Sequence, residues 1–264
     1  MLLIIRHHIR YRYAAPVTYS IQQFRVTPAS GASQLVRRSG MSKRRTSSTP
    51  PATPTAMRYT LVPKPHSEIR VSVSGEVETE ALDEGRLFDE AGPIPLEHFT
   101  CATALTAPDA AIRDLAQRVR ALDTPGSLLA LTDRIEECVQ YRQAQTHPAG
   151  TAAQALQRGI GDARDYAHLM IACCRARGVP ACCVSGYFDA GAGESVTVHV
   201  WADVWVDHGW VSEDATQAAF AGERHCRLAV ARDHEAAVPV RGSRVEGKDE
   251  TLSAHVSIDA RADQ

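Results

Sequence analysis

The sequence lacks a long apolar run, an excess of charge of one sign and the pattern expected of a secretory leader. Its 264 residues carry a net charge of −2 and give a pI near 6.6, so no global charge attracts nucleic acid or a membrane surface. The apolar residues 1–5 are interrupted by Arg6 without a cleavage signature, and no run approaches the ~20 residues of a membrane-spanning helix. We therefore expect a cytoplasmic protein without nucleic-acid or membrane partners; the sequence does not indicate its oligomeric state.

The sequence also lacks the cysteine spacings of a disulfide framework or a zinc knuckle. The seven cysteines are odd in number, and the chain is long enough to form a core, which argues against a disulfide framework. The vicinal pairs are Cys173–Cys174 and Cys182–Cys183. Although His168, His199 and His208 lie in the same region, these pairs do not have the Cys-x2-Cys pattern, and we interpret them as core residues. We expect no metal and no cofactor.

Hydrophobic periodicity divides the chain into two parts. Residues 3–28 and 68–80 alternate like strands, whereas residues 108–122 carry apolar side chains at helical spacing. A second helix is expected over 127–139. The fold class is therefore α+β, with a β-rich domain over residues 1–100 and a mixed domain, including a C-terminal extension, over residues 101–264.

A basic segment lies between the early strands. Residues 37–45 hold two Arg-Arg pairs and a lysine, and residues 46–56 are rich in Thr, Ser and Pro. Because no aromatic residues are interleaved with these charges, we interpret 37–45 as a solvated loop, with single-stranded RNA binding as the alternative. The role of residues 37–56 stays open at this point.

A well-bounded helix begins at Asp162. Asp162 is a favourable N-cap, the helix body is apolar, and Gly178 followed by Pro180 marks its end. Position 163 is then the first helical residue, where backbone N–H groups and the helix dipole favour an anionic side chain. Ala163 occupies this position, while the following Asp165 can complement the helix N-terminus and His168 is expected to be hydrogen-bonded within the fold.

Two further polar residues follow on predicted strands. Residues 196–206 alternate so that five aliphatic residues share one face and His199 lies on the other. After a turn, a second strand reaches Asp214. A two-residue turn at His208–Gly209 would pair Asp214 with Asp203, so a bulge or bend would be needed to bring Asp214 to His199.

The stretch Gly161 to His168 resembles the core motif of the bacterial transglutaminase-like proteins. The similarity continues through 175–181, 184–187, 199–205, 209–210 and 214–216, and it includes residues 11–28 and 68–78, which resemble the separate N-terminal domain of that family. The family has its catalytic cysteine where this chain has Ala163. The resemblance implies a papain-like core, helices packed on an antiparallel sheet, and a Cys-His-Asp triad with His199 as general base and Asp214 as its orienting carboxylate.

The activity implied by this resemblance is acyl transfer on amide or peptide bonds through a thioester, ending in hydrolysis, transamidation or amide formation. The partners would be a peptide or amide substrate and an amine acceptor. Asp162, Tyr187 and Trp201 are candidates for the cleft that binds the substrate. The substrate itself cannot be read from the sequence.

Ala163 admits two interpretations. It is either an engineered Cys-to-Ala replacement in an enzyme or a natural loss of the nucleophile in a peptide-binding or scaffold protein on the same fold. We favour the engineered replacement because His199 and Asp214 both remain. Cys173 and Cys174 lie ten and eleven positions further along the helix, about 15 Å away at 1.5 Å per residue, and cannot supply the thiol.

Overall fold

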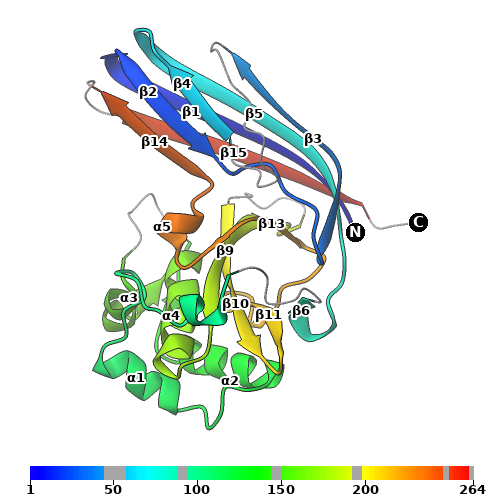
Figure 1. Cartoon of the computed structure of the whole chain (residues 1–264), viewed down its shortest axis with the longest axis vertical. Coiled ribbons are helices and arrows are strands. Elements are labelled where there is room, and N and C mark those ends of the chain that lie inside the picture. Colours follow the sequence, from blue (N-terminus) through cyan, green and yellow to red (C-terminus); the bar gives the residue numbers. More distant parts are fainter. Residues whose placement is uncertain (45–57, 88–93, 144–149, 192–197, 246–249, 262–264) are drawn as a thin grey trace.

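The computed structural model describes residues 1–44, 58–87, 94–143, 150–191, 198–245 and 250–261. Within these ranges the chain forms a strand-rich upper part and a mixed lower part (Figure 1). The chain passes between the two parts twice, over residues 80–85 and over residues 238–239.

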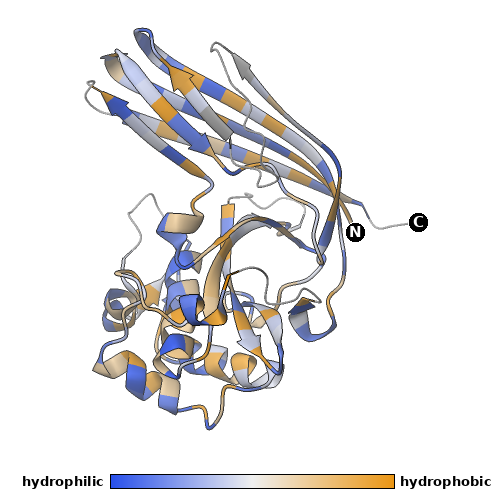
Figure 2. Ribbon diagram, in the orientation of Figure 1, coloured by the Kyte–Doolittle hydropathy of each residue, from blue (hydrophilic) through white to orange (hydrophobic). Residues whose placement is uncertain are grey.

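The upper part is a sandwich of two antiparallel sheets. The first has the order β15-β1-β5-β3 and the second the order β14-β2-β4. Their strands are β1 (Leu2–Val17), β2 (Tyr19–Phe24), β3 (Gln34–Arg44), β4 (Arg58–Val62), β5 (His66–Thr79), β14 (Val240–Val245) and β15 (Glu250–Arg261). Polar and apolar residues alternate along β1 and β5, as the stripes in Figure 2 show, because successive side chains of a strand point to opposite faces.

The apolar face of the first sheet is covered at both of its ends. Toward one end, Tyr11 and Val71 pack with Phe24 and Val62 of the second sheet. Toward the other end, a smaller cluster joins the first sheet to the lower part of the molecule. Its buried members are Leu3, Ile5, Val77, Tyr187, Cys226 and Val256.

The lower part packs helices on one face of a third antiparallel sheet. The strand order is β12-β11-β10-β9-β13, and β6 pairs with β11. The strands are β6 (Arg86–Leu87), β9 (Ala181–Phe188), β10 (Val198–Val206), β11 (Gly209–Asp214), β12 (Ala219–Phe220) and β13 (His225–Ala231). The helices are α1 (Ala110–Gln117), α2 (Pro125–Glu136), α3 (Ala152–Arg158), α4 (Ala163–Ala176) and α5 (His234–Ala237), and the short strands β7 (Gln140–Tyr141) and β8 (Ile160–Gly161) pair in parallel.

Helix α4 is the centre of this lower core. Its residues 169–174 are fully buried, and it packs on the face of β10 that carries Val200, Ala202, Val204 and Val206. The alternation of residues 196–206 predicts this apolar face, and the structure confirms it for residues 198–206. Residues 196 and 197 lie outside the described part of the chain. The α+β class and the expected packing of helices on an antiparallel sheet are likewise confirmed.

The expected division at residue 100 needs correction. Residues 240–261, assigned to an extension of the second domain, instead form β14 and β15, which pair with β2 and β1. The pair β6–β11 also places residues 86–87 in the lower sheet. The upper sandwich is therefore built from both ends of the described chain. Pairing with β15 covers an edge of β1 that would otherwise be free.

The basic segment also differs from the expectation. Residues 37–44 belong to β3, an edge strand paired with β5, rather than to a loop. Arg37 forms an ion pair with Glu78, and Arg38 lies 3.9 Å from Glu76 on the adjacent strand. Cross-strand charge pairing accounts for this part of the basic run. Residues 45–56 lie outside the described residues.

The two expected helices are shorter than predicted or shifted. The helix expected over 108–122 ends at Gln117, although Val119 and Leu122 are buried beyond it, and the helix expected over 127–139 spans 125–136. Thr124 caps the second helix and Pro125 occupies its first position, where the missing N–H of proline costs nothing. No helix in the described ranges is both long and apolar enough to cross a bilayer.

Candidate active site

Helix α4 begins with a capping box that leaves position 163 at its first turn. The Asp162 side chain accepts from the N–H groups of Arg164 and Asp165, and Asp165 accepts from the Asp162 N–H at 3.3 Å. These contacts use the N–H groups of residues 162, 164 and 165. The N–H of Ala163 has no partner among the described residues, so it is free to bind an anion at the positive end of the helix dipole.

The carboxylates of the capping box are both paired. Arg164 Nη2 contacts Asp162 Oδ2 at 2.6 Å, and Arg158 Nη2 contacts Asp165 Oδ2 at 3.3 Å. Burial opposes ionisation of Asp162, but its bonds from Arg164 outweigh that effect and lower its pKa. Asp165 complements the helix N-terminus as the sequence indicates, while burial and the neighbouring Asp162 raise its pKa.

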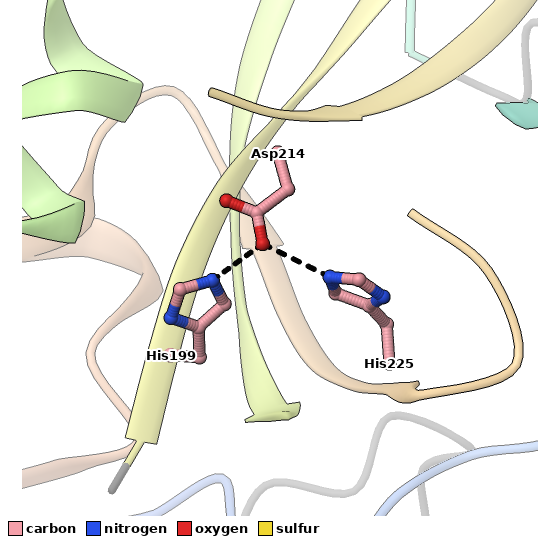
Figure 3. A group of neighbouring side chains, drawn as sticks. All are labelled: His199, Asp214 and His225. Carbon is pink, nitrogen blue, oxygen red and sulfur yellow. Dashed lines mark hydrogen bonds and ion pairs between the residues drawn. The ribbon is translucent and has the colours of Figure 1, made fainter. Parts of the chain in front are cut away.

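His199 and Asp214 meet without a bulge. The turn between β10 and β11 is Asp207–His208, both with positive φ, so Asp203 pairs with Ser212 rather than with Asp214. The expected register, which paired Asp203 with Asp214, is wrong by two residues. The corrected register brings Asp214 one position beyond the last pair, and His199 Nε2 lies 2.6 Å from Asp214 Oδ2 (Figure 3).

His225 is a third member of this group that the sequence interpretation missed. Its Nε2 lies 3.0 Å from the same Asp214 oxygen that contacts His199, as Figure 3 shows. Its Nδ1 accepts from the N–H of Gly222 at 3.2 Å, so the neutral ring carries its proton on Nε2 and donates it to Asp214. Because β9 lies between β10 and β13, no local spacing signal connects the two histidines.

The hydrogen bonds keep Asp214 ionised despite complete burial. Burial alone would raise the pKa of this carboxyl, but the bonds from His199 and His225 outweigh burial and hold the pKa well below its usual range. Its other oxygen, Oδ1, accepts from the N–H and hydroxyl of Thr216. Asp214 is therefore a fixed acceptor that leaves only Nδ1 of His199 available to another group.

The donor set of two histidines and one carboxylate resembles a zinc site in kind, so we tested its geometry. The relevant atoms lie within 4.8 Å of one another. Two ligands of a tetrahedral zinc ion at ~2.0–2.1 Å stand about 3.3 Å apart, whereas His199 Nε2 and Asp214 Oδ2 are 2.6 Å apart. The arrangement fits direct hydrogen bonds better than ligation of a shared ion.

Behind this group lies a buried polar support. The ring of Trp201 stacks on that of His199 with 6.1 Å between the ring centroids. Its Nε1 donates to Ser212 Oγ at 2.9 Å. Ser212 in turn donates to Asp203, which also pairs with Arg227. The three hydrogen-bonded side chains of this support, Trp201, Ser212 and Asp203, are all buried, so the support is rigid.

A cavity of about 350 Å³ brings position 163 and His199 together. Its walls come from the start of α4, from residues 198–200 of β10, from residues 238–240 and from the first sheet of the sandwich. Tyr141 and Gln143 also line it. The predicted pairing of position 163, His199 and Asp214 is thus found around one cavity, with Asp214 behind His199.

The three predicted substrate-binding residues have different positions. Asp162 lines the cavity. Tyr187 and Trp201 do not line it: Tyr187 is fully buried and contacts His7 Nδ1 at 2.9 Å, while Trp201 forms part of the support. Their assignment to the cleft surface is corrected, because both aromatic rings fill the interior of the sheet packing.

Among the described residues, no cysteine lines the cavity beside position 163. All seven cysteines are free, and the four vicinal ones are buried, as expected of core residues. Burial raises the pKa of Cys173 to about 12 and that of Cys183 still further, and a buried thiol of this kind is unreactive. His168 is also internal, since it accepts from the N–H of His234 at 3.1 Å.

Comparison with known proteins matches first the core and then the N-terminal region. Residues 113–215, which contain the start of α4, His199 and Asp214, match the family model of the transglutaminase-like superfamily. Residues 3–78 match the bacterial transglutaminase-like N-terminal region. The chain therefore has, in this order, the N-terminal region and the core that these two models of transglutaminase-like proteins describe.

Relatives and solved structures agree with these matches. The uncharacterized protein ML0607 of Mycobacterium leprae is 27% identical over 260 residues, covering 89% of this chain and 90% of its own length. The uncharacterized protein Rv2569c of Mycobacterium tuberculosis is 32% identical over 124 residues, covering 42% of this chain and 40% of its own. A structure described as a candidate cysteine protease from Cytophaga hutchinsonii aligns with a TM-score of 0.77 at 18% identity, covering all of this chain and 92% of its own, and it shows the shared fold.

Proposed function

We propose that the chain is the thiol-free form of an enzyme that transfers acyl groups from amide or peptide bonds, with a cysteine at position 163 in the active form. The observation that carries this proposal is the hydrogen-bonded pair His199–Asp214 beside the cavity that Ala163 also lines. Asp214 occupies Nε2 of His199, so Nδ1 is the ring atom left to exchange a proton with a side chain at position 163.

The residues support each step of such a reaction. A thiolate at position 163 would attack the carbonyl carbon, and the resulting oxyanion would accept from the free N–H of residue 163. His199 would give a proton to the departing amine as the thioester forms. Water or an amine would then attack the thioester, returning its proton to His199 and releasing the acid or the new amide.

Tyr141 would be a second donor for the oxyanion. It lines the same cavity as Ala163, and burial together with the charges of Asp162 and Asp214 raises its pKa. Its hydroxyl therefore keeps its proton at neutral pH and can donate a hydrogen bond. The sequence interpretation missed Tyr141 because its short strand has no recognisable period.

The alternative proposal is a binding or scaffold protein that has lost catalysis naturally, and Ala163 itself is the observation that favours it. Both proposals accept a peptide or amide ligand in the same cavity. They differ in whether the surroundings still activate a thiol at position 163.

The test is the alkylation rate of the Ala163→Cys variant by iodoacetamide as a function of pH, followed by peptide mass spectrometry. The exposed Cys101 in the same chain serves as the internal reference. We expect the new thiol to react with an apparent pKa at least one unit below ~8.5, and His199→Ala to abolish that difference. A profile that matches Cys101 with and without His199 would reject the enzyme and leave the binding protein.

A further inference from the structure

Among the described residues, part of the apolar face of the first sheet is exposed on β15, and this part lines the same cavity as the start of α4. The second sheet covers this face around Tyr11 and Val71, and β9 and β13 cover it around Leu3 and Ile5. Beside the first of these clusters, Leu252 and Ala254 of the neighbouring strand β15 are exposed, and Leu252 retains 49% exposure.

These two residues are the exposed part of the cavity wall contributed by the sandwich. In the register of β1 and β15, His7 pairs with Val256, Ile9 with Ala254 and Tyr11 with Leu252. Residues at paired positions share a face of the sheet. The described members of this wall that line the cavity are His7, Ile9, Leu252, Ala254 and Val256.

The rest of the cavity is also apolar around the reacting position. Val198 and Val200 flank His199 on β10, and residues 238–240 supply two valines and a proline. A cavity of about 350 Å³ is large enough for an organic group of several carbon atoms. An apolar surface left exposed beside a reactive position indicates a ligand-binding surface.

No unpaired charge among the described lining residues opposes an apolar ligand. Asp162 and Arg164 are the only acidic, lysine or arginine side chains in the described lining, and they pair with each other at 2.6 Å. His7 and His234 are neutral near pH 7, because burial lowers the pKa of each to about 4. A charged acyl substituent would lose its hydration here without gaining a counter-ion.

We propose that the cleft between the sandwich and the core is an acyl-donor pocket that selects a neutral, apolar acyl group, with β1 and β15 as its specificity wall. This inference rests on the proposed acyl-transfer function for its chemistry, but the pocket exists in the chain with Ala163. The acyl chain lies against Ile9, Ala254 and Leu252, and its carbonyl carbon is presented to position 163.

The first experiment measures binding to the chain as it is. Saturation-transfer NMR is recorded with the N-acetyl amides of leucine, glutamine, lysine and glutamate as probes. We expect at least fivefold stronger transfer to the leucine amide than to the lysine and glutamate amides. Ala254→Glu should reduce the leucine signal at least fivefold, whereas the control Ser253→Glu, which adds the same charge to the other face of β15, should change it less than twofold.

The second experiment measures reaction in the Ala163→Cys variant. Peptide acyloxymethyl ketones that differ only in leucine, lysine or glutamate beside the reactive carbonyl are compared by their labelling rates. We expect at least tenfold preference for leucine, and we expect Ala254→Glu to reduce it and to favour lysine. Thermal melts of both charge variants establish that they are folded.

The outcomes separate the two proposals. A thiol that depends on His199 but labels with equal rates for all probes, together with equal saturation transfer, would overturn the apolar pocket and keep the enzyme. Selective binding of the leucine amide with an unactivated thiol would keep the pocket and reject the enzyme.

Discussion

Asp214 is the residue on which most polar contacts of the site converge. It is fully buried and accepts four hydrogen bonds, two from histidine rings and two from Thr216. Hydrogen bonds to a charged group contribute about 1.5–3 kcal/mol each to stability. His225 is therefore a positioning residue: it helps to fix the oxygen that orients His199.

We expect His225→Phe to lower the free energy of unfolding by about 2 kcal/mol at pH 7, because one hydrogen bond to the buried carboxylate is lost. A depressed carboxyl pKa stabilises the fold above its unfolded value near 4 and ceases to do so as the pH falls through the folded value. The difference between the variant and the parent should thus shrink below pH 4. Urea unfolding at pH 7 and pH 3.5 measures it.

The control for this prediction is His8→Phe, since His8 is exposed and its side chain is hydrogen-bonded to Ser72 rather than to any residue of the site. In the Ala163→Cys background, His225→Phe should also displace the pH profile of alkylation, while His8→Phe should leave it unchanged. A loss of less than 0.5 kcal/mol and an unchanged profile would show that His225 does not position Asp214.

Glu213 is the opposite case from its neighbour Asp214. It points to the helix side, is fully buried and accepts from Thr132, while its second carboxyl oxygen has no partner among the described residues. Burial raises the pKa of Glu213 well above its usual value. The folded protein therefore favours the neutral carboxylic acid form of this side chain more strongly than the unfolded chain does.

We expect Glu213→Gln to stabilise the protein increasingly as the pH rises. Above pH ~4.5 the unfolded chain releases the Glu213 proton and the folded chain keeps it, so stability falls by about 1.4 kcal/mol per pH unit until the folded pKa is reached. Glutamine removes this slope. Urea unfolding at pH 6, 7 and 8 measures it, with the exposed Glu97→Gln as control; equal slopes in parent and variant would contradict a protonated Glu213.

Among the elements, β9 joins the sandwich, the site and the helix layer. Gly186 of β9 lies beneath Trp201, and a Cβ at this position would run into the Trp201 ring and the backbone oxygen of Cys226. The absence of a side chain at this position lets Trp201 stack on His199. A backbone atom cannot move aside as a flexible side chain can.

Gly186→Ala should destabilise the protein by about 3 kcal/mol or more, because overpacking a rigid sheet forces backbone shifts. In the Ala163→Cys background it should also abolish the lowered apparent pKa of alkylation at position 163, since Trp201 can no longer support His199. Gly209→Ala is the matched control, because a Cβ there meets nothing within 4 Å. Thermal denaturation compares the two, and a similar small loss in both would refute the role of Gly186.

The elements also show what the sequence could predict. Asp162, Ala163 and Gly178 identify the site helix because caps and stops act locally. The register of β10 and β11 was misplaced because the positive-φ turn positions are taken by Asp207 and His208, whereas glycine is the residue usually expected there. His225 was missed because its contact depends on the pairing of β13 with β9, which no local pattern specifies.

The same limit applies to the strands at the end of the described chain. β15 pairs with β1 across nearly the whole length of the sequence, and alternation alone does not say which sheet a strand joins. The cavity wall formed by Leu252, Ala254 and Val256 could therefore not be foreseen. Position 163, His199 and Asp214 could be foreseen, because each of them lies in a short, continuous stretch that resembles a known motif.

For the whole molecule, buried neutral histidines set the behaviour in acid. Burial lowers the pKa of His7, His168 and His234 from 6.5 to about 4. His7 joins the sandwich to Tyr187 of the core, and His168 accepts from the backbone N–H of His234. The rings in these contacts are neutral, and the contact of His7 links the two parts of the protein.

The sign of the effect follows from proton binding. Between pH 6.5 and 4 the unfolded chain binds more protons at these histidines than the folded chain, so stability rises with pH across this window. From pH 7 to pH 5 we expect a loss of about 2 kcal/mol per histidine. His168→Gln should remove one such share in urea unfolding at the two pH values, while His8→Gln should remove none; an equal acid loss in both variants would contradict this origin.

The pairing of β15 with β1 also sets the order in which the site can be completed. The helix, His199 and Asp214 all lie before residue 215, but the wall that faces them is finished only when residues 250–261 have left the ribosome and paired with β1. Closure across the full chain is slow compared with local helix and hairpin formation. During synthesis, a thiol at position 163 would therefore be present before its pocket, and substrate selection would begin only with the last described strand.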